Sequence, residues 1–102
     1  MSKLILVYIT CKDKKEAVKI SNFLLNSHLA ACTNIFPIHS FYWWNSKIQK
    51  DREVVVIAKT IEKHYSRIKK EIKQIHSYQI PCILKIKSEA NKDYSDWVKK
   101  NI

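Results

Sequence analysis

The sequence of 102 residues contains no glycine, and this absence excludes one large group of binding sites. Glycine-rich loops that hold nucleotide phosphates need residues without a side chain, so the sequence has no motif of that kind. Cysteine is also scarce. The three cysteines form no Cys-x-x-Cys pair, so they indicate neither a disulfide framework nor a zinc ribbon. Free thiols suit a reducing compartment, and we therefore expect a cytoplasmic protein.

Long apolar runs are missing as well. The run LILVYI at residues 4–9 is far shorter than the roughly 18 residues of a membrane-spanning helix. It also lacks the small-residue pattern of a cleaved signal peptide, so a first β-strand is the plainer interpretation. We expect no membrane partner.

Arginine is rare although the chain is strongly basic. The net charge is +10, yet only Arg52 and Arg67 of the 19 basic residues are arginines. Lysine lacks the planar group that reads guanine and holds phosphate through two hydrogen bonds. The lysines are also scattered along the chain, which favours a solvated surface over a dedicated nucleic-acid face. We predict weak, salt-dependent binding to nucleic acid and no specific nucleic-acid partner.

What the chain does contain is an ordinary globular mixture. Hydrophobic residues make up 46% and charged residues 27%, and the length suits one domain over residues 1–102. The periodic segments predict the order β-α-β-β-α-β with a short C-terminal helix. We expect strands at 3–10, 31–44, 49–59 and 80–87, and helices at 13–28, 60–75 and after residue 91. This order is the ferredoxin-like α+β plan, an antiparallel sheet with two helices on one face.

Polar residues mark the expected helix starts. Asp13 can cap the first helix, and Glu16 can complete a capping box with it. Thr60 can cap the second helix and Asn91 the last. Pro37 lies inside the second strand and favours an edge position or a bulge. The second helix has the clearest apolar stripe, formed by Ile61, Tyr65, Ile68, Ile72 and Ile75.

The long central hairpin has apolar residues on both faces. Residues 41–44 read FYWW, and the return strand carries a second apolar run. Alternate residues of a strand point to opposite faces, and two helices can cover only one face of the sheet. Either the short last helix covers the other face, or another copy of the chain does. We predict self-association through Phe41–Trp44 and Val54–Ile57.

Several motifs occur in order along nearly the whole chain. They are HLAACTNIFPIHSFYWWNSKIQKDREVVVIAKT at 28–60, HSYQIPCI at 76–83 and DYSDWV at 93–98. With these motifs the sequence resembles the CutA divalent-cation-tolerance family. The resemblance implies the ferredoxin-like fold, a tight homotrimer joined through the hairpins, and a link to divalent metals, with copper as the suggested ion. Because the family is not an established enzyme group, the resemblance implies no enzyme activity and no catalytic residue.

His76 is the leading candidate for a metal ligand. It matches the family's histidine in the pattern H-Y--P, and a neutral imidazole suits copper. The alternative is a helix-terminal histidine that bonds backbone carbonyls. Cys82 and Cys11 are the other candidates, and their thiolates would favour Cu(I). Cys82 shares a strand face with Leu84 and Ile86, which favours a buried apolar role, whereas Cys11 is either an exposed thiol or a packing residue.

Several positions qualify the resemblance. Ile9 stands where some members have a copper-associated cysteine, Ile75 where some have a second histidine, and Cys82 where many have an acid. Glu53 matches a family residue and is expected near a subunit boundary, either beside Lys59 or in an acid–base pair. We therefore predict a homotrimer that binds copper weakly. The alternatives are a PII-like, small-molecule-responsive regulator and a hydrolase that uses an inter-subunit cleft.

Overall fold

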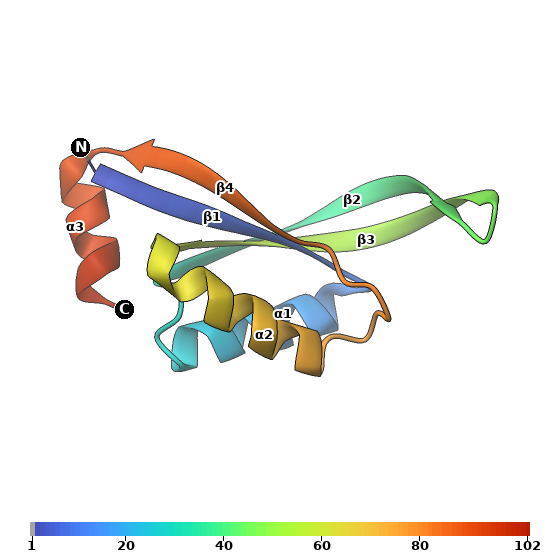
Figure 1. Ribbon diagram of the computed structural model, residues 1–102, viewed down its shortest axis with the longest axis horizontal. Coiled ribbons are helices and arrows are strands. Elements are labelled where there is room, and N and C mark those ends of the chain that lie inside the picture. The colour runs from blue at the N-terminus through green and yellow to red at the C-terminus, as the bar shows by residue number, and fades with distance from the viewer. Residues whose placement is uncertain (1) are drawn as a thin grey trace.

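The computed structural model describes residues 2–102 and shows an antiparallel sheet with two helices against one face (Figure 1). The order of the elements is the predicted one. The strands are β1 (Ser2–Cys11), β2 (Cys32–Trp44), β3 (Lys47–Thr60) and β4 (Ile83–Ala90). The helices are α1 (Lys14–Asn26), α2 (Tyr65–Ile75) and α3 (Lys92–Lys100), with a 3-10 turn at Glu62–His64 before α2. No helix within residues 2–102 is long and apolar enough to cross a membrane.

The strand order in the sheet is β2-β3-β1-β4, and each neighbouring pair is antiparallel. β2 and β4 are therefore the two edge strands. Pro37, which cannot donate a ladder hydrogen bond, lies in β2, and this confirms its predicted edge position. Helix α3 packs against β1 and β3 at the end of the sheet that lies opposite the hairpin (Figure 1).

The hydrophobic core lies between the sheet and helices α1 and α2. Alternate residues of β1 point to this side and meet the apolar stripes of both helices, as their periodicity predicted. Each buried aliphatic side chain of this size contributes about 1.5–3 kcal/mol relative to an exposed one. Core residues without exposed surface include Val7, Ile9, Ile20, Leu24, Ile68 and Ile72.

Strands β2 and β3 form a long hairpin that projects beyond the helices and gives the molecule its extents of 45 × 23 × 21 Å (Figure 1). Its last residue pair is Trp44 opposite Lys47. At the tip, Asn45 and Ser46 have φ angles of 51° and 63°, the positive values that a type I′ turn requires at both central residues. Glycine usually takes such a position, and asparagine and serine take it in this chain.

The outer part of the hairpin is not covered within the chain. The side chains of Phe41, Trp43 and Ile48 are 67%, 71% and 58% exposed. The return stretch 54–57 is different, because Val55 and Val56 are fully buried by residues of the same chain. The apolar surface available to another copy therefore lies mainly toward the tip, around Phe41–Trp44, rather than at residues 54–57.

The predicted cap of the second helix is wrong. Thr60 is the last residue of β3, and its buried hydroxyl donates to the carbonyl oxygen of Leu29 at 2.6 Å. Helix α2 starts five residues later, at Tyr65, without a side-chain cap. Asn91 does stand at the start of α3, but its side chain bonds Asp93 at 2.5 Å and does not cap the helix.

The fourth strand begins later than predicted, at Ile83 rather than at residue 80. Pairing with β1 ends where Ile83 lies opposite Ile9, and the residues before it form a loop in which Ile80 is 71% exposed. The predicted alternation is present, but its apolar side lies on the uncovered face of the sheet. Leu84 and Ile86 are 51% and 44% exposed there.

Candidate functional site

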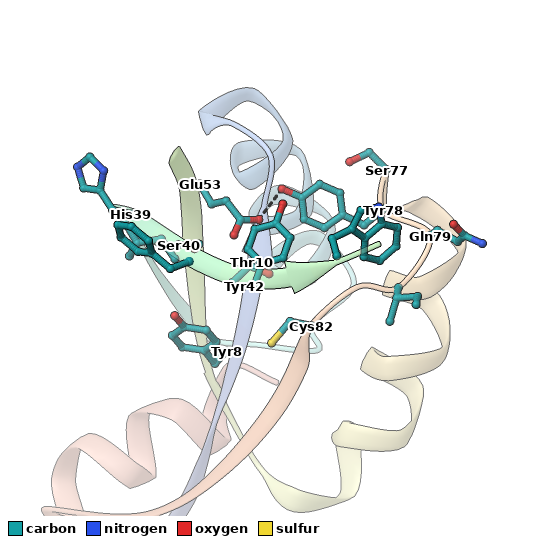
Figure 2. A pocket seen from close by; sticks show the side chains of 14 residues that line it. Tyr8, Thr10, His39, Ser40, Tyr42, Glu53, Ser77, Tyr78, Gln79 and Cys82 are labelled. Carbon is teal, nitrogen blue, oxygen red and sulfur yellow. Dashed lines mark hydrogen bonds between the residues drawn. The ribbon is translucent and has the colours of Figure 1, made fainter. Parts of the chain in front are cut away.

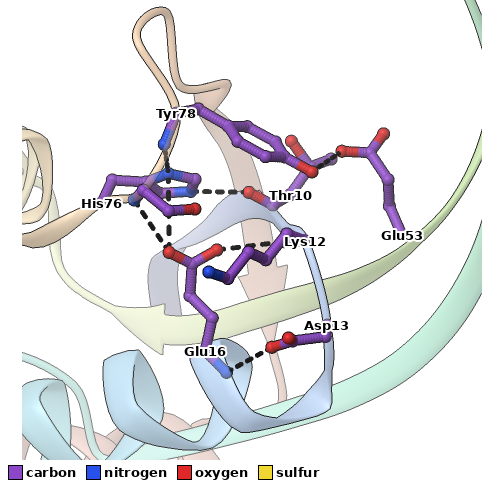
Figure 3. A network of polar contacts seen from close by, with 8 residues as sticks. Thr10, Lys12, Asp13, Glu16, Glu53, His76 and Tyr78 are labelled. Carbon is purple, nitrogen blue, oxygen red and sulfur yellow. Dashed lines mark hydrogen bonds and ion pairs between the residues drawn. The ribbon is translucent and has the colours of Figure 1, made fainter.

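Glu16 connects the start of α1 to the loop that follows α2. Its backbone N–H donates to Asp13 Oδ1 at 2.8 Å, which confirms the predicted cap. Its carboxylate accepts from the N–H of Lys12 at 3.0 Å and from the N–H of Ser77 at 2.8 Å (Figure 3). Burial alone would raise the pKa of Glu16, but these hydrogen bonds outweigh it, and the pKa lies below its ordinary value.

His76 directly follows α2 and has a fully buried side chain. Its Nε2 lies 2.7 Å from the carbonyl oxygen of Thr10, and its Nδ1 lies 3.0 Å from the N–H of Tyr78 (Figure 3). A carbonyl only accepts and an amide N–H only donates, so Nε2 carries the proton and Nδ1 accepts. The ring is therefore a neutral imidazole that joins β1 to the 76–78 loop. Glu16 Oε2 lies 3.9 Å from Nδ1.

Cys11 ends β1 on the helix side of the sheet and has no exposed surface. It packs in the core, so the alternative of an exposed thiol is wrong. Burial, followed by the carboxylates of Glu16, Asp13 and Glu53, raises the pKa of the Cys11 thiol to about 12. The thiol is therefore protonated at neutral pH.

One ligand atom each of Cys11, Glu16 and His76 lies within 4.8 Å of the other two, and we call these residues the donor cluster. The sequence singled out the cysteine and the histidine, which are 65 positions apart. It missed Glu16 as a third donor, although the capping-box pattern had already singled out that residue. A sulfur, an oxygen and a nitrogen donor together form a mixed set that suits a transition metal.

Cys82 is not part of the donor cluster. It lies before β4, is half-buried, and lines a cleft of about 840 Å³ on the face of the sheet that the helices leave open (Figure 2). Burial raises the pKa of the Cys82 thiol, a nearby hydrogen bond from Thr10 opposes this effect, and the charge of Glu53 adds to it.

Glu53 lies in the same cleft and bonds a residue that the sequence did not suggest. The hydroxyl of Tyr78 donates to Glu53 Oε2 at 2.5 Å (Figure 2). Within the chain Lys59 does not contact Glu53, because the Lys59 ammonium lies over the ring of Tyr94, 5.5 Å from its centroid. Burial raises the pKa of Tyr78, as does its hydrogen bond to Glu53, so the phenol keeps its proton.

The fold and the donor cluster define a small ferredoxin-like α+β protein with a projecting hairpin and a buried sulfur, oxygen and nitrogen donor set. The chain belongs to the CutA1 divalent ion tolerance protein family, whose model matches residues 5–101. It is 41% identical over 97 residues to the divalent-cation tolerance protein CutA of Archaeoglobus fulgidus, covering 94% of this chain and 95% of the relative. The CutA of Pyrococcus horikoshii is 40% identical over 96 residues, covering 93% and 94%.

Solved structures agree with this assignment. The structure of the A. fulgidus protein, described as a periplasmic divalent cation tolerance protein CutA, matches with a TM-score of 0.93 and 40% identity over 96% of this chain and 97% of that one. A CutA1 structure from Oryza sativa matches with a TM-score of 0.93 and 33% identity, covering 97% and 93%. The predicted fold and family are therefore confirmed.

Proposed function

We propose that this chain serves divalent-cation tolerance as a homotrimer that binds a transition-metal ion, copper in the first place, weakly at the donor cluster. The observation that carries the proposal is the convergence of Cys11, Glu16 and His76 within 4.8 Å in a member of this family. The proposed role is binding and not catalysis. Cys82, the third candidate from the sequence, lies outside the cluster and is assigned no metal.

The state of each ligand supports weak rather than tight binding. The Cys11 thiol, with its pKa near 12, must lose its proton before sulfur can bind a metal. Both nitrogens of His76 are engaged, so the ring must give up its bond to Thr10 or to Tyr78. A thiolate and an imidazole together favour Cu(I), and the loss of a proton makes the affinity increase with pH.

The trimer is supported by surfaces that the chain leaves uncovered. The outer hairpin exposes Phe41, Trp43 and Ile48, and the open face of the sheet exposes Leu84 and Ile86. Both edge strands, β2 and β4, also offer unpaired backbone groups. A closed ring of subunits would cover the hairpins and the edges together.

A reducing compartment is part of the same proposal. The chain has three free cysteines, and the Cu(I) state of copper persists where thiols stay reduced. We therefore place the protein in the cytoplasm. Weak and sequence-independent nucleic-acid binding remains a prediction from the lysine-rich composition.

The test is a Cu(I) competition titration under reducing conditions. Cys11→Ser should lower the affinity at least about tenfold, because a metal site loses about 10–100-fold even when only a supporting residue is removed. Cys82→Ser is the matched control and should leave the affinity unchanged. His76→Ala should also weaken binding, provided that its circular dichroism spectrum shows a native fold. If wild type, Cys11→Ser and His76→Ala bind copper alike, the cluster is structural and the metal role is wrong.

A further inference from the structure

Two donor atoms of the donor cluster already hold backbone N–H groups of one short segment. Oε2 of Glu16 lies 3.9 Å from Nδ1 of His76. The N–H of Ser77 donates to this Oε2 at 2.8 Å, and the N–H of Tyr78 donates to this Nδ1 at 3.0 Å (Figure 3). Two successive amides therefore occupy the oxygen and the nitrogen that the proposed metal site needs.

Nδ1 is the nitrogen of His76 that can bind a metal ion without losing a proton. Nε2 carries the ring proton and donates it to the carbonyl oxygen of Thr10 at 2.7 Å, so Nδ1 has the free lone pair of the ring. Neutral histidine binds metal ions through such a lone pair. Ligation through Nδ1 also keeps the bond to Thr10, whereas ligation through Nε2 would break it. The tautomer of the ring therefore selects Nδ1 as the ligand atom.

Ligation through Nδ1 excludes the contact with Tyr78. The single lone pair of Nδ1 can accept a hydrogen bond or bind a metal ion, but it cannot do both. A carboxylate differs, because its two oxygens together offer about four acceptor positions, so Glu16 can keep the N–H of Ser77 when it binds a metal ion. The N–H of Tyr78 is thus the group that has to leave.

Tyr78 is held in place by side chains. Residues 76–82 lie in neither a helix nor a strand, so no ladder of backbone hydrogen bonds fixes this segment. The ring of Tyr78 lies against the ring of His76, with centroids 4.9 Å apart, and its hydroxyl donates to Glu53 Oε2 at 2.5 Å (Figure 3). Displacement of the Tyr78 backbone therefore works against the bond between its hydroxyl and Glu53.

The donor cluster is too deeply buried to take up an ion without a movement of the chain. Cys11 has no exposed surface, the side chain of His76 has none, and that of Glu16 is 7% exposed. The segment 77–78 contacts two of these three donors directly. Its movement would free a ligand atom and open the site in one step.

We propose that the segment Ser77–Tyr78 is a gate for the donor cluster, which occupies Nδ1 of His76 in the metal-free protein and is displaced when His76 binds copper. The inference rests on the proposed function and adds how the site is regulated. The N–H of Tyr78 is an internal competitor that lowers the copper affinity, and the gate moves in response to copper. All the contacts that define the gate lie within one subunit, so the inference uses no surface that another copy would cover.

The first test is NMR spectroscopy of the intact protein before and after addition of Cu(I) under reducing conditions. Hydrogen exchange of the Tyr78 amide should become at least about tenfold faster, because this amide loses its acceptor. The amide of His76, which donates to the carbonyl oxygen of Ile72 at 2.9 Å, is the control and should keep its rate. The ¹⁵N signal of His76 Nδ1 should shift while Nε2 keeps its proton. An unchanged Tyr78 amide, or loss of the Nε2 proton, overturns the proposal.

The second test weakens the gate without changing a ligand. Tyr78→Phe keeps the backbone N–H and the ring but removes the hydroxyl that bonds Glu53. Since a hydrogen bond to a carboxylate stabilises the closed gate, its loss should raise the Cu(I) affinity roughly tenfold in a competition titration. Tyr65→Phe is the matched control, because it loses a phenol hydrogen bond of 3.1 Å to the carbonyl oxygen of Ile83, and it should keep the wild-type affinity. An unchanged affinity in Tyr78→Phe, or an equal rise in both variants, contradicts the gate.

The outcomes separate the gate from metal binding itself. If the wild type binds Cu(I) and Cys11→Ser weakens the binding, but the Tyr78 amide stays protected, the gate alone is wrong. If the wild type binds no Cu(I), the proposed function is wrong and the gate is wrong with it.

Discussion

The helix-covered end of the molecule and the projecting hairpin are similarly rich in apolar residues, but only the first buries them. Ile68 and Ile72 of α2 are fully buried, whereas Trp43 and Ile48 of the hairpin are 71% and 58% exposed. The difference shows that apolar residues in a sequence predict burial but do not tell which chain provides the cover. Here one end has a core of its own, and the other is a surface without cover in the single chain.

Simple geometry explains the contrast. Helix α1 has 13 residues, and at 1.5 Å per residue it extends about 20 Å. Strand β2 also has 13 residues, but at about 3.3 Å per residue it extends roughly 43 Å. Two helices of this length can cover only about half of the hairpin, so the rest is left uncovered within the single chain.

The largest expected effect comes from an acid in the uncovered half. Trp43→Glu should convert the proposed trimer, about three times the subunit mass of 12.1 kDa, into monomers or unfolded chains. Burial of an unpaired charge in an interface costs several kcal/mol, more than such an assembly tolerates. Light scattering at micromolar concentration measures the mass. As a control, Asn45→Asp adds the same charge at the tip and should leave the trimer intact. If the wild-type protein is itself a monomer, the proposed trimer is wrong.

Alanine substitutions separate the two ends more finely. Ile72→Ala should lower the free energy of unfolding by about 2–5 kcal/mol per chain, because it opens a cavity in the core. Ile48→Ala, in the uncovered half, should instead weaken the assembly and act mainly at low protein concentration. Denaturant unfolding at two protein concentrations distinguishes the cases. If both variants lost the same free energy of unfolding at both protein concentrations, the core and the hairpin would not differ in what covers them.

The smallest expected effect is one of pH, and it belongs to the helix-covered end. The pKa of Glu16 is lower in the folded protein than in the unfolded chain. Its hydrogen bonds therefore stabilise the fold above the ordinary glutamate pKa of about 4.3, and this contribution is lost as the pH falls through the lower folded value. Glu16→Gln should flatten the dependence of stability on pH in this range, as measured by thermal unfolding. A pH dependence of stability that is unchanged in Glu16→Gln would contradict the assignment.

The fold could be predicted from the sequence because its signals are local. The four-three spacing in α2 and the alternation in β4 need only neighbouring residues, and both are present. The errors involve distant contacts. Thr60 resembles a helix cap in the sequence, but its hydroxyl donates to the carbonyl oxygen of Leu29, 31 positions away. Alternation in β4 also could not tell which of its faces the helices cover.

The site was partly predictable because residue types and short motifs are local signals, whereas contacts between distant residues are not. His76 and Cys11 were singled out by residue type and motif, but the contact between Glu16 and Ser77 spans 61 positions and needs the folded chain. The stated alternative for His76, a histidine that bonds a backbone carbonyl, is present, but the sequence could identify neither Thr10 of β1 as that partner nor the N–H of Tyr78 as the second one. One of the partners, the carbonyl of Thr10, is a backbone atom, which any residue at that position would offer.

The absence of glycine has a consequence beyond the turn at the hairpin tip. Every residue of this chain carries a side chain that narrows its backbone freedom before folding begins, so the unfolded ensemble is smaller and less entropy is lost on folding. Asn45, Ser46 and His28 instead adopt positive φ angles in the folded state. The folded chain therefore has local backbone strain at these three residues. Its unfolded state is less flexible throughout, because no residue is glycine.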